Sequence, residues 1–292
     1  MITIALFGSR HQDAHADALT RFIDALGAHA SDIRLTIEQR FCSYLEQSLD
    51  IHPSADTFSR LDHAPDLALS IGGDGTFLRV ARIVGALGTP IMGINSGHLG
   101  YLSAASITEC DTVVSDIINH RYSVEPRSLI AISSDCTDAI PDTLYALNEV
   151  AILRRDTASM ISIDATLDDL PLATYRGDGL IVSTPTGSTG YNLSVGGPLV
   201  APKTPCWIIS PVAPHSLTMR PLVVNDTARL QLVSRSRSET YMLSIDGKAT
   251  IMPERSALFI SRAPFCINVV HRHGQTFAAT IRTKLLWGSD RQ

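Results

Sequence analysis

The chain has 292 residues, of which 45% are hydrophobic and 18% are charged, as in a globular protein with one large or two moderate domains. Its formal net charge of -5 argues against nucleic acid or an anionic membrane as the main partner. The five cysteines are scattered, so we expect neither a disulfide framework nor a cysteine-based zinc site. Reduced thiols favour a cytoplasmic location, and no apolar run is long enough to span a bilayer.

The first part of the chain alternates between strand and helix patterns. Apolar runs predict strands, and apolar residues at helical spacing predict helices, with Asp13 as the candidate N-cap of the first helix and Gly27 as its end. The predicted strands are 2–7, 33–37, 67–71 and 90–94, and the predicted helices surround 19–26, 41–45, 77–84 and 113–118. This alternation predicts a Rossmann-like parallel α/β sheet, whose ligands bind beyond the carboxyl ends of the strands.

From about residue 122 the pattern changes to short strands separated by turn residues. The predicted strands are 127–133, 144–153, 161–167, 179–184, 228–234, 240–246, 257–262 and 266–271. They predict an antiparallel, all-β, sandwich-like domain. We therefore expect an α/β domain at 1–121, a β domain at 122–272 and a C-terminal tail at 273–292, in which 277–287 is helical or extended.

The stretch Ile71–Thr76 joins a buried strand to a helix and reads Ile-Gly-Gly-Asp-Gly-Thr. A strand that passes through glycines into a helix points backbone N–H groups and the positive end of the helix at one spot, which suits phosphate. Asp74 is the exception, since a carboxylate repels phosphate. Its chemistry suits taking a proton from a hydroxyl or holding a magnesium ion. The alternative is a tight turn with Asp74 as the helix N-cap.

Other nucleotide-binding signatures are missing from the sequence. It contains neither the GxGxxG fingerprint after the first strand nor a GxxxxGK[ST] loop, so phosphoryl transfer has to be built on the Asp74 loop. A second glycine loop at 95–101 contains His98 and Tyr101. A single loop histidine is more often structural than a metal ligand, and a core aromatic is the plain interpretation of Tyr101. The ten histidines show no ligand spacing, so no protein-bound metal is expected.

Several polar clusters interrupt the predicted β domain. Asn148-Glu149 lies inside an apolar run, where buried polar side chains need partners, although a strand edge facing water explains the pair equally well. Gly177-Asp178-Gly179 and Ser244–Lys248 have the composition of hairpin turns. The run Thr184–Tyr191 contains four hydroxyl residues, two glycines and a tyrosine, which is more than a turn needs and predicts a polar pocket.

The loop at 71–76 resembles the signature shared by NAD kinases, diacylglycerol-type lipid kinases and phosphofructokinases. Together with 148–149, 177–179 and 183–189, it resembles bacterial NAD kinases over most of the chain. The resemblance implies phosphorylation of the adenosine ribose 2′-hydroxyl of NAD by ATP to give NADP. It also implies that Asp74 is the catalytic base and that NAD lies between the two domains.

The resemblance further implies which residues bind the substrates. Those expected to bind NAD are Gly73, Asp74, Gly75, Tyr101, Asn148, Glu149, Arg176, Asp178, Thr186, Thr189, Gly190, Tyr191, Asn192, Ser194, Asp246 and Lys248. Those expected to bind the ATP phosphates are Gly72, Gly73, Gly75, Thr76 and Arg79. Tyr101 would stack near adenine, and Asp246 and Lys248 would face the nicotinamide. Magnesium, or another divalent cation, would be held by the phosphates.

The family pattern also implies a homodimer or homotetramer, and a tail that crosses back to the first domain with the ending Lys284–Trp287. Gly190 departs from the commonest family pattern, which has alanine there.

Two alternatives remain at this point. The first is a kinase of diacylglycerol or sphingosine, which would need an apolar acceptor pocket, whereas 184–191 is polar. The second is a nucleotide-sensing module with a degenerate site, and the intact Asp74 and Glu149 argue against it. The sequence leaves open whether polyphosphate replaces ATP.

Overall fold

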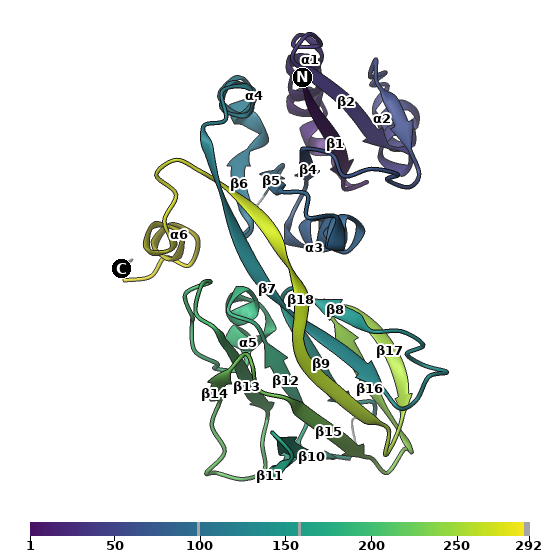
Figure 1. The fold of residues 1–292 in the computed structure, drawn as a ribbon, viewed down its shortest axis with the longest axis vertical. Helices are drawn as coiled ribbons and strands as arrows, with labels where there is room; N and C mark the ends of the chain where they lie inside the picture. The colour runs from purple at the N-terminus through teal and green to yellow at the C-terminus, as the bar shows by residue number, and fades with distance from the viewer. Residues whose placement is uncertain (98–99, 157–158, 289–292) are drawn as a thin grey trace. The chain divides into compact units, whose positions relative to one another are not determined.

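The computed structural model describes residues 1–97, 100–156 and 159–288. Contacts divide the chain into two compact units, the first formed by Met1–Pro126 with Ile267–Gln292 and the second by Arg127–Cys266. Two strands, β7 (Tyr122–Ser134) and β18 (Ala257–Arg272), pair with each other and continue from one unit into the other (Figure 1).

A parallel sheet forms the centre of the first unit. Its strands follow the order β6 (Ser103–Ser106), β5 (Ile91–Asn95), β4 (Leu67–Ile71), β1 (Ile2–Gly8), β2 (Ile33–Glu38) and β3 (Asp56–Phe58). Every residue of β4 and β5 is buried, which explains their uninterrupted apolar sequence. Ile71 pairs with Gly8 on one side and with Ile94 on the other, so the carboxyl ends of β1, β4 and β5 lie together.

Four helices bury the apolar positions that the sequence predicts. They are α1 (Ala16–Gly27), α2 (Gln39–Leu49), α3 (Asp74–Val84) and α4 (Cys110–Ile118), with 3-10 turns at Asp13–His15, Gly85–Leu87 and Ile107–Glu109. The C-terminal helix α6 (Phe277–Lys284) buries none of its residues. One core joins the strands to α1, α2 and α4 through Leu19, Phe22, Phe41, Leu45, Val113 and Ile117. Helix α3 contacts β4 and β5 and buries Phe77 and Val80.

Two predictions about helix starts are wrong. Asp13 is not the N-cap of α1, because it begins a 3-10 turn. The N-cap of α1 is His15, whose side chain makes no capping hydrogen bond. Asp74 is not the N-cap of α3 either. The helix begins at Asp74 itself, Gly73 is the N-cap, and no side chain caps this helix.

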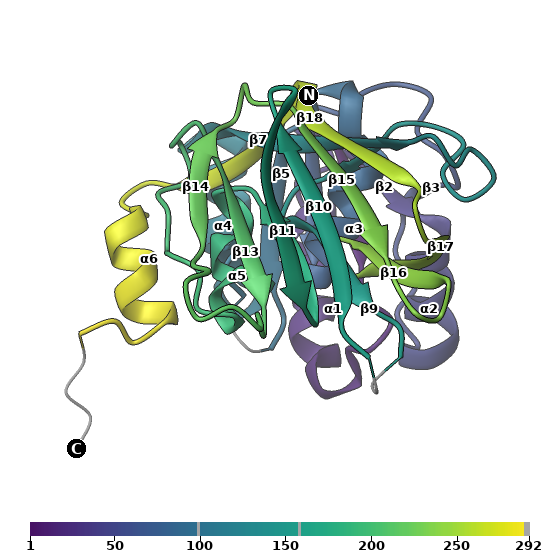
Figure 2. The same ribbon diagram turned by 90° about the horizontal axis from the view of Figure 1, so that it is seen from below.

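The second unit consists of two antiparallel sheets. One contains β11 (Leu170–Gly177), β10 (Ile161–Leu167), β15 (Leu230–Arg235) and β18 in this order, and β7 joins β18 to β8 (Leu144–Ala146). Figure 2 shows β11, β10 and β15 side by side. The other sheet of this unit has the order β14 (Leu222–Asn225), β13 (Cys206–Val212), β12 (Gly179–Ser183), β9 (Glu149–Arg154), β16 (Thr240–Ile245) and β17 (Lys248–Pro253). The 3-10 turn Thr186–Thr189 and α5 (Tyr191–Ser194) follow β12.

Alternate residues of β10, β15 and β16 are buried, as the period of a strand requires. Buried residues of both sheets form one core, which includes Ile163, Leu232, Leu180, Trp207 and Tyr241. The predicted fold class is therefore confirmed: a parallel α/β sheet belongs to the first unit and antiparallel β structure to the second.

Some strand predictions are wrong in detail. The predicted strand 144–153 is divided into β8 and β9, because the backbone at Leu147 and Asn148 bonds to other segments. The predicted strands 257–262 and 266–271 form one strand, β18, since an extended backbone accommodates Pro264.

The sequence did not indicate β3, β6, β11, β13, β14 or β17. Strands β11 and β14 are largely exposed, so no apolar alternation marks them. Strand β13 is buried except at its last residue, and its apolar run could have revealed it. Across the described ranges, none of the helices is long and apolar enough to cross a membrane.

Candidate active site

The glycine–aspartate loop lies where β4 ends, next to the ends of β1 and β5. Gly72 has φ +142°, which side chains rarely tolerate, and a Cβ there would lie 2.7 Å from Thr76 Oγ1. Its N–H donates to Ile94 O at 2.9 Å, which ties the loop to β5. Space remains open around Gly73 and Gly75, where a Cβ would meet nothing within 4 Å. The loop is thus closely packed at Gly72 and open at the two glycines flanking Asp74.

Two backbone N–H groups hold the carboxylate of Asp74. Tyr101 N–H donates to Oδ2 at 2.8 Å, and Leu102 N–H donates to Oδ1 at 3.0 Å. The carboxylate lies so close to Gly100 that a Cβ there would collide with Oδ1. Each carboxylate oxygen retains a further lone pair, so the group is oriented and can still accept a proton.

Lys284 of α6 holds the segment that supplies these N–H groups. Its Nζ donates to Gly100 O at 2.5 Å, to Ser103 O at 3.0 Å and to Tyr101 O at 3.1 Å. Burial lowers the pKa of Lys284 to about 8, and the charge of Asp74 opposes that decrease. Nζ also lies 5.9 Å from the centroid of the Tyr101 ring. The C-terminal helix therefore acts on Asp74 through the backbone of residues 100–103.

Arg79 lies one turn into α3 and is fixed by two contacts. Its Nη1 forms an ion pair with Glu38 Oε1 at 2.5 Å, and its Nη2 donates to Gly8 O at 3.0 Å. Glu38 is buried, with 8% of its surface exposed. The predicted contact between Arg79 and ATP phosphate thus concerns a side chain that is already positioned by the protein.

In the second unit, Asn148 lies in the bend between β8 and β9, and Glu149 is the first residue of β9. The carboxylate of Asp246 accepts three backbone hydrogen bonds from this bend: from Leu147 at 2.8 Å, from Asn148 at 2.8 Å and from Glu149 at 3.1 Å. Asp246 N–H returns a hydrogen bond to Glu149 O at 3.0 Å.

Asp246 (φ 47°) and Gly247 (φ 77°) form the hairpin turn between β16 and β17, as their composition predicts. The Asp246 carboxylate is therefore committed to shaping the Asn148-Glu149 bend. Its predicted contact with NAD stays a prediction.

Glu149 is an unusual carboxyl group. Burial, followed by the nearby charge of Asp246, raises its pKa to about 7, although a hydrogen bond from the backbone N–H of Tyr191 opposes this. Within the described chain, Glu149 Oε2 and Asn148 Oδ1 are buried and accept no hydrogen bond. A Cβ at Gly190 would lie 3.0 Å from Glu149 Oε2, so the glycine leaves room beside this carboxylate.

The hydroxyl-rich run surrounds the same bend. Thr184 Oγ1 donates to Leu147 O at 2.5 Å, and Ser183 Oγ donates to Asn148 O at 3.2 Å. The buried guanidinium of Arg127 donates to Thr186 Oγ1 at 3.3 Å. Thr189 Oγ1 donates to Thr186 O at 3.3 Å. Much of the hydroxyl content therefore builds the loop.

Asn192 is fully buried, and its amide is used within the protein. Nδ2 donates to the carbonyls of Ser188 and Pro198, each at 3.1 Å, and Oδ1 accepts from Ser210 Oγ at 2.7 Å. The predicted contact of Asn192 with NAD stays a prediction. Tyr191 and Ser194 of α5 are exposed.

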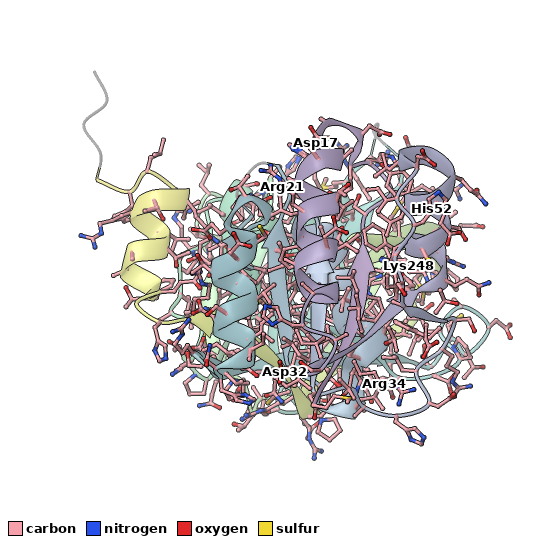
Figure 3. All side chains as sticks on the ribbon, turned by 90° about the horizontal axis from the view of Figure 1, so that it is seen from above. Asp17, Arg21, Asp32, Arg34, His52 and Lys248 are labelled. Atoms are coloured by element: carbon pink, nitrogen blue, oxygen red, sulfur yellow. The ribbon has the colours of Figure 1, made fainter. Side chains whose placement is uncertain are left out.

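The other predicted residues are spread over both sheets of the second unit. Asp178 connects β11 of one sheet to β12 of the other, and its carboxylate forms a two-pronged contact with Arg154 at 2.9 and 3.2 Å. Arg176 is exposed on β11, and Lys248, labelled in Figure 3, is exposed at the start of β17.

Metal ligation can be tested on the donor groups present. Among the described residues, no three His, Cys, Asp or Glu side chains gather so as to hold a metal ion. His98 lies outside the described residues.

The sequence reasoning did not single out Glu38, Arg127 or a role for Lys284. Lys284 was noted only as part of the family's ending. Two signals were available in the sequence. Glu38 is a charged residue at the end of the apolar strand β2, and Arg127 is a charged residue directly before an apolar run.

The fold and the loop together define the class of protein. An oriented carboxylate at the N-terminus of a helix, between open glycines and at the carboxyl end of a parallel sheet, is the arrangement of a phosphotransferase that acts on a hydroxyl.

Comparison with known proteins narrows this class. Residues 24–122 match the model of the ATP-NAD kinase N-terminal domain, and residues 147–271 match that of the ATP-NAD kinase C-terminal domain. The chain is 41% identical over 290 residues to an NAD kinase of Bacteroides fragilis, with 98% of each chain covered. It is 40% identical over 290 residues to an NAD kinase of Porphyromonas gingivalis, with 99% of each covered.

Solved structures agree with these matches. An NAD kinase from Archaeoglobus fulgidus in complex with ATP is 26% identical, with a TM-score of 0.72 over 97% of this chain and 99% of that one. Yeast NADH kinase complexed with NADH has a TM-score of 0.90 over 100% of this chain and 89% of that one, and at 21% identity this likeness shows the fold alone.

The chain belongs to the NAD kinase family. It is a kinase that phosphorylates NAD, and the lipid-kinase alternative is not favoured, since the models that match both parts of the chain and the similar full-length relatives are those of NAD kinases.

Proposed function

We propose that the enzyme transfers the γ-phosphoryl group of ATP to the 2′-hydroxyl of the adenosine ribose of NAD, giving NADP and ADP. Asp74 takes the hydroxyl proton, an O–P bond forms at the γ-phosphorus, and the bond from this phosphorus to the β,γ-bridging oxygen breaks. The observation that supports this proposal is the pair of backbone hydrogen bonds that orients Asp74 between two open glycines.

The surroundings of Asp74 suit phosphoryl transfer in two respects. A base has to reach the hydroxyl that it deprotonates, and the open space at Gly73 and Gly75 admits substrate on both sides of the residue. The first turn of α3 also presents backbone N–H groups, which stabilise phosphate oxygens and the charge that spreads over them during transfer.

The second unit supplies acceptor groups for the dinucleotide. The buried oxygens Asn148 Oδ1 and Glu149 Oε2, which lack a hydrogen-bond partner in the described structure, are suited to the adenine amino group and ribose hydroxyls of NAD. The remaining contacts proposed for NAD come from Tyr101, Arg176, Asp178, Thr186, Thr189, Gly190, Tyr191, Asn192, Ser194, Asp246 and Lys248. Phosphate contacts come from Gly72, Gly73, Gly75, Thr76 and Arg79.

A divalent cation, taken as magnesium, enters with ATP and neutralises charge on its phosphates. The proposal also includes a homodimer or homotetramer. It further includes a cytoplasmic location, which the five free cysteines suit because such thiols persist in a reducing compartment.

The experiment that tests this proposal is an assay of the purified chain with ATP, magnesium and NAD, followed by NMR of the product. Phosphate is expected on the 2′-oxygen of the adenosine ribose. The NAD analogue without this hydroxyl, diacylglycerol and sphingosine are expected to remain unphosphorylated. Phosphate at another position, or a phosphorylated lipid without NADP, would overturn the assignment.

A further inference from the structure

A cavity in the first unit lies at the end of the parallel sheet opposite the glycine–aspartate loop. Its volume is about 580 Å³, and it is lined by the last turns of α1, the first half of β2 and residues 49–54 at the end of α2. Leu35 of β2 pairs with Ile4, and Ile4 pairs with Leu67 at the start of β4, whereas Asp74 follows the end of β4. We call it the helix-end cavity. Its described lining contains none of the residues proposed to contact NAD or ATP.

Much of the lining of the helix-end cavity is apolar. The apolar side chains come from α1, β2 and the end of α2, and they are Ile23, Leu26, Ile33, Leu35, Leu49 and Ile51. Leu35 and Leu49 are half-buried and pack on the core of the unit, so they present apolar surface to the cavity. A ligand with an apolar body would remove this surface from water, and the volume is that of sites that hold small organic molecules.

The charged groups around the helix-end cavity are mainly acidic. Asp24 of α1 and Asp50 at the end of α2 line it, and both are exposed. Neither helix has a basic residue in its last turn, so the partial negative charge of two helix C-termini adds to that of the two carboxylates. Lysine and arginine are absent from the described lining, and its imidazole, that of His52, lies with Nε2 3.0 Å from Asp50 Oδ1. The cavity is therefore suited to a cation.

We infer that the helix-end cavity binds a small organic ammonium ion, whose apolar body covers Leu35 and Leu49 and whose charged group lies beside Asp24 and Asp50. An apolar carboxylate would fit the same apolar wall, but the two aspartates and the helix ends would repel it. A metal ion would find too few ligands, since no three His, Cys, Asp or Glu side chains gather within the described residues so as to hold one. A short amine would use the charges and leave the apolar wall in water.

The first experiment compares three probes by NMR titration of the full-length, isotope-labelled chain, followed at its backbone amides. Octylammonium combines a cation with an apolar chain, octanoate reverses the charge, and ethylammonium lacks most of the apolar chain. Octylammonium is expected to shift the amides of residues 23–33 and 49–54 selectively and to bind about tenfold more tightly than either other probe. Equal affinity for octanoate or ethylammonium, or shifts spread over the whole surface, would overturn the inference.

The second experiment replaces the two carboxylates, as Asp24→Asn and Asp50→Asn. Asparagine keeps the size of the side chain and tolerates the left-handed backbone of Asp50, which has φ 55°. Because both carboxylates are exposed, each replacement is expected to weaken octylammonium binding about two- to fivefold, and the double variant about fivefold or more. The matched control is Asp17→Asn in the first turn of α1 (Figure 3), outside the cavity lining, which is expected to leave the affinity unchanged. Wild-type affinity in the double variant would overturn the inference.

The third experiment tests the apolar wall with Leu49→Ser, or with the smaller change Leu49→Ala where the serine variant does not fold. Leu49 is the last residue of α2, and its replacement is expected to weaken octylammonium binding about threefold or more while ethylammonium binding stays unchanged. An equal effect on both amines would contradict the apolar contact. Dilution of the free protein tests the other possible occupant, because amide shifts at 49–54 that follow protein concentration would place a second copy on this face and overturn the inference. None of these measurements requires NADP formation, so they decide the cavity independently of the proposed function.

Discussion

The backbone N–H of Tyr101 donates a hydrogen bond of 2.8 Å to Asp74 Oδ2, although the two residues are 27 positions apart. Leu102 N–H binds the other oxygen at 3.0 Å. Lys284 in turn binds the carbonyls of residues 100, 101 and 103. The proposed base is therefore oriented by a loop, and the loop is held by a lysine of the C-terminal helix.

Replacing Asp74 tests the proposed base directly. Asp74→Asn keeps the shape but removes the capacity to accept a proton, so kcat is expected to fall about 10²–10⁴-fold in initial-rate assays of NADP formation. The KM for NAD is expected to change much less. The control is Asp17→Asn, an exposed carboxylate on α1 (Figure 3), which should leave both parameters unchanged. Near-normal turnover of Asp74→Asn would move the base elsewhere.

Replacing Lys284 tests whether the C-terminal helix positions Asp74. Lys284→Met removes three hydrogen bonds to the loop, so kcat is expected to fall about tenfold while the KM for NAD changes less. Amide hydrogen exchange at Tyr101 and Leu102, measured by NMR, should become faster. Arg282→Met, on the exposed side of the same helix, is the matched control. Unaltered kcat and unaltered exchange in Lys284→Met would remove the positioning role.

Replacing Glu149 tests its proposed contact with NAD hydroxyls. Loss of a charge-assisted hydrogen bond costs about 1.5–3 kcal/mol, so Glu149→Gln is expected to raise the KM for NAD about tenfold or more without a comparable effect on ATP. The pKa of Glu149 is about 7, so the wild-type KM for NAD should rise as the pH falls below 7. That pH dependence should be absent from the variant. Glu239→Gln, an exposed residue of the same unit, is the control, and an unchanged KM in Glu149→Gln would contradict the contact.

The same carboxyl group makes stability depend on pH. Folding raises the Glu149 pKa from 4.5 to about 7, so the folded state holds its proton more tightly than the unfolded state does. Its contribution to stability is complete below pH 4.5 and is lost as the pH rises through 7. Glu149→Gln should therefore gain stability over the wild type between pH 5 and pH 8, by at most about 3 kcal/mol in urea unfolding. An unchanged difference between the two proteins over this range would contradict the raised pKa.

Replacing Asp246 tests the support of the Asn148-Glu149 bend. Asp246→Asn tolerates the same left-handed backbone but presents one acceptor oxygen, so a backbone N–H loses its partner at a cost of about 1–3 kcal/mol. We expect a lower melting temperature and a raised KM for NAD. The control is Asp169→Asn, which is exposed and also left-handed at φ 64° in the β10–β11 hairpin. Equal melting temperatures for the two variants would contradict the role of Asp246.

Local sequence was sufficient to predict the central elements. The five buried residues of β4, the glycines that follow and the apolar spacing of α3 predict a strand, a tight loop and a helix. The Asp246-Gly247 hairpin was equally visible, because its φ angles suit these two residue types. Such features depend on the conformational preferences of neighbouring residues, so they can be read from a short stretch. Exposed strands such as β11 carry no apolar pattern and were missed for this reason.

Only the tertiary structure decided the partners of the polar side chains. The Asp74 carboxylate could have capped its own helix, and Asp246 could have faced solvent. Instead, Asp74 binds residues 27 and 28 positions away, Asp246 binds residues 97 to 99 positions away, and Lys284 binds carbonyls more than 180 positions away. Backbone N–H and C=O groups occur at almost every residue and carry no sequence signature. Which of them meets a given carboxylate or ammonium depends on how the sheets bring distant loops together.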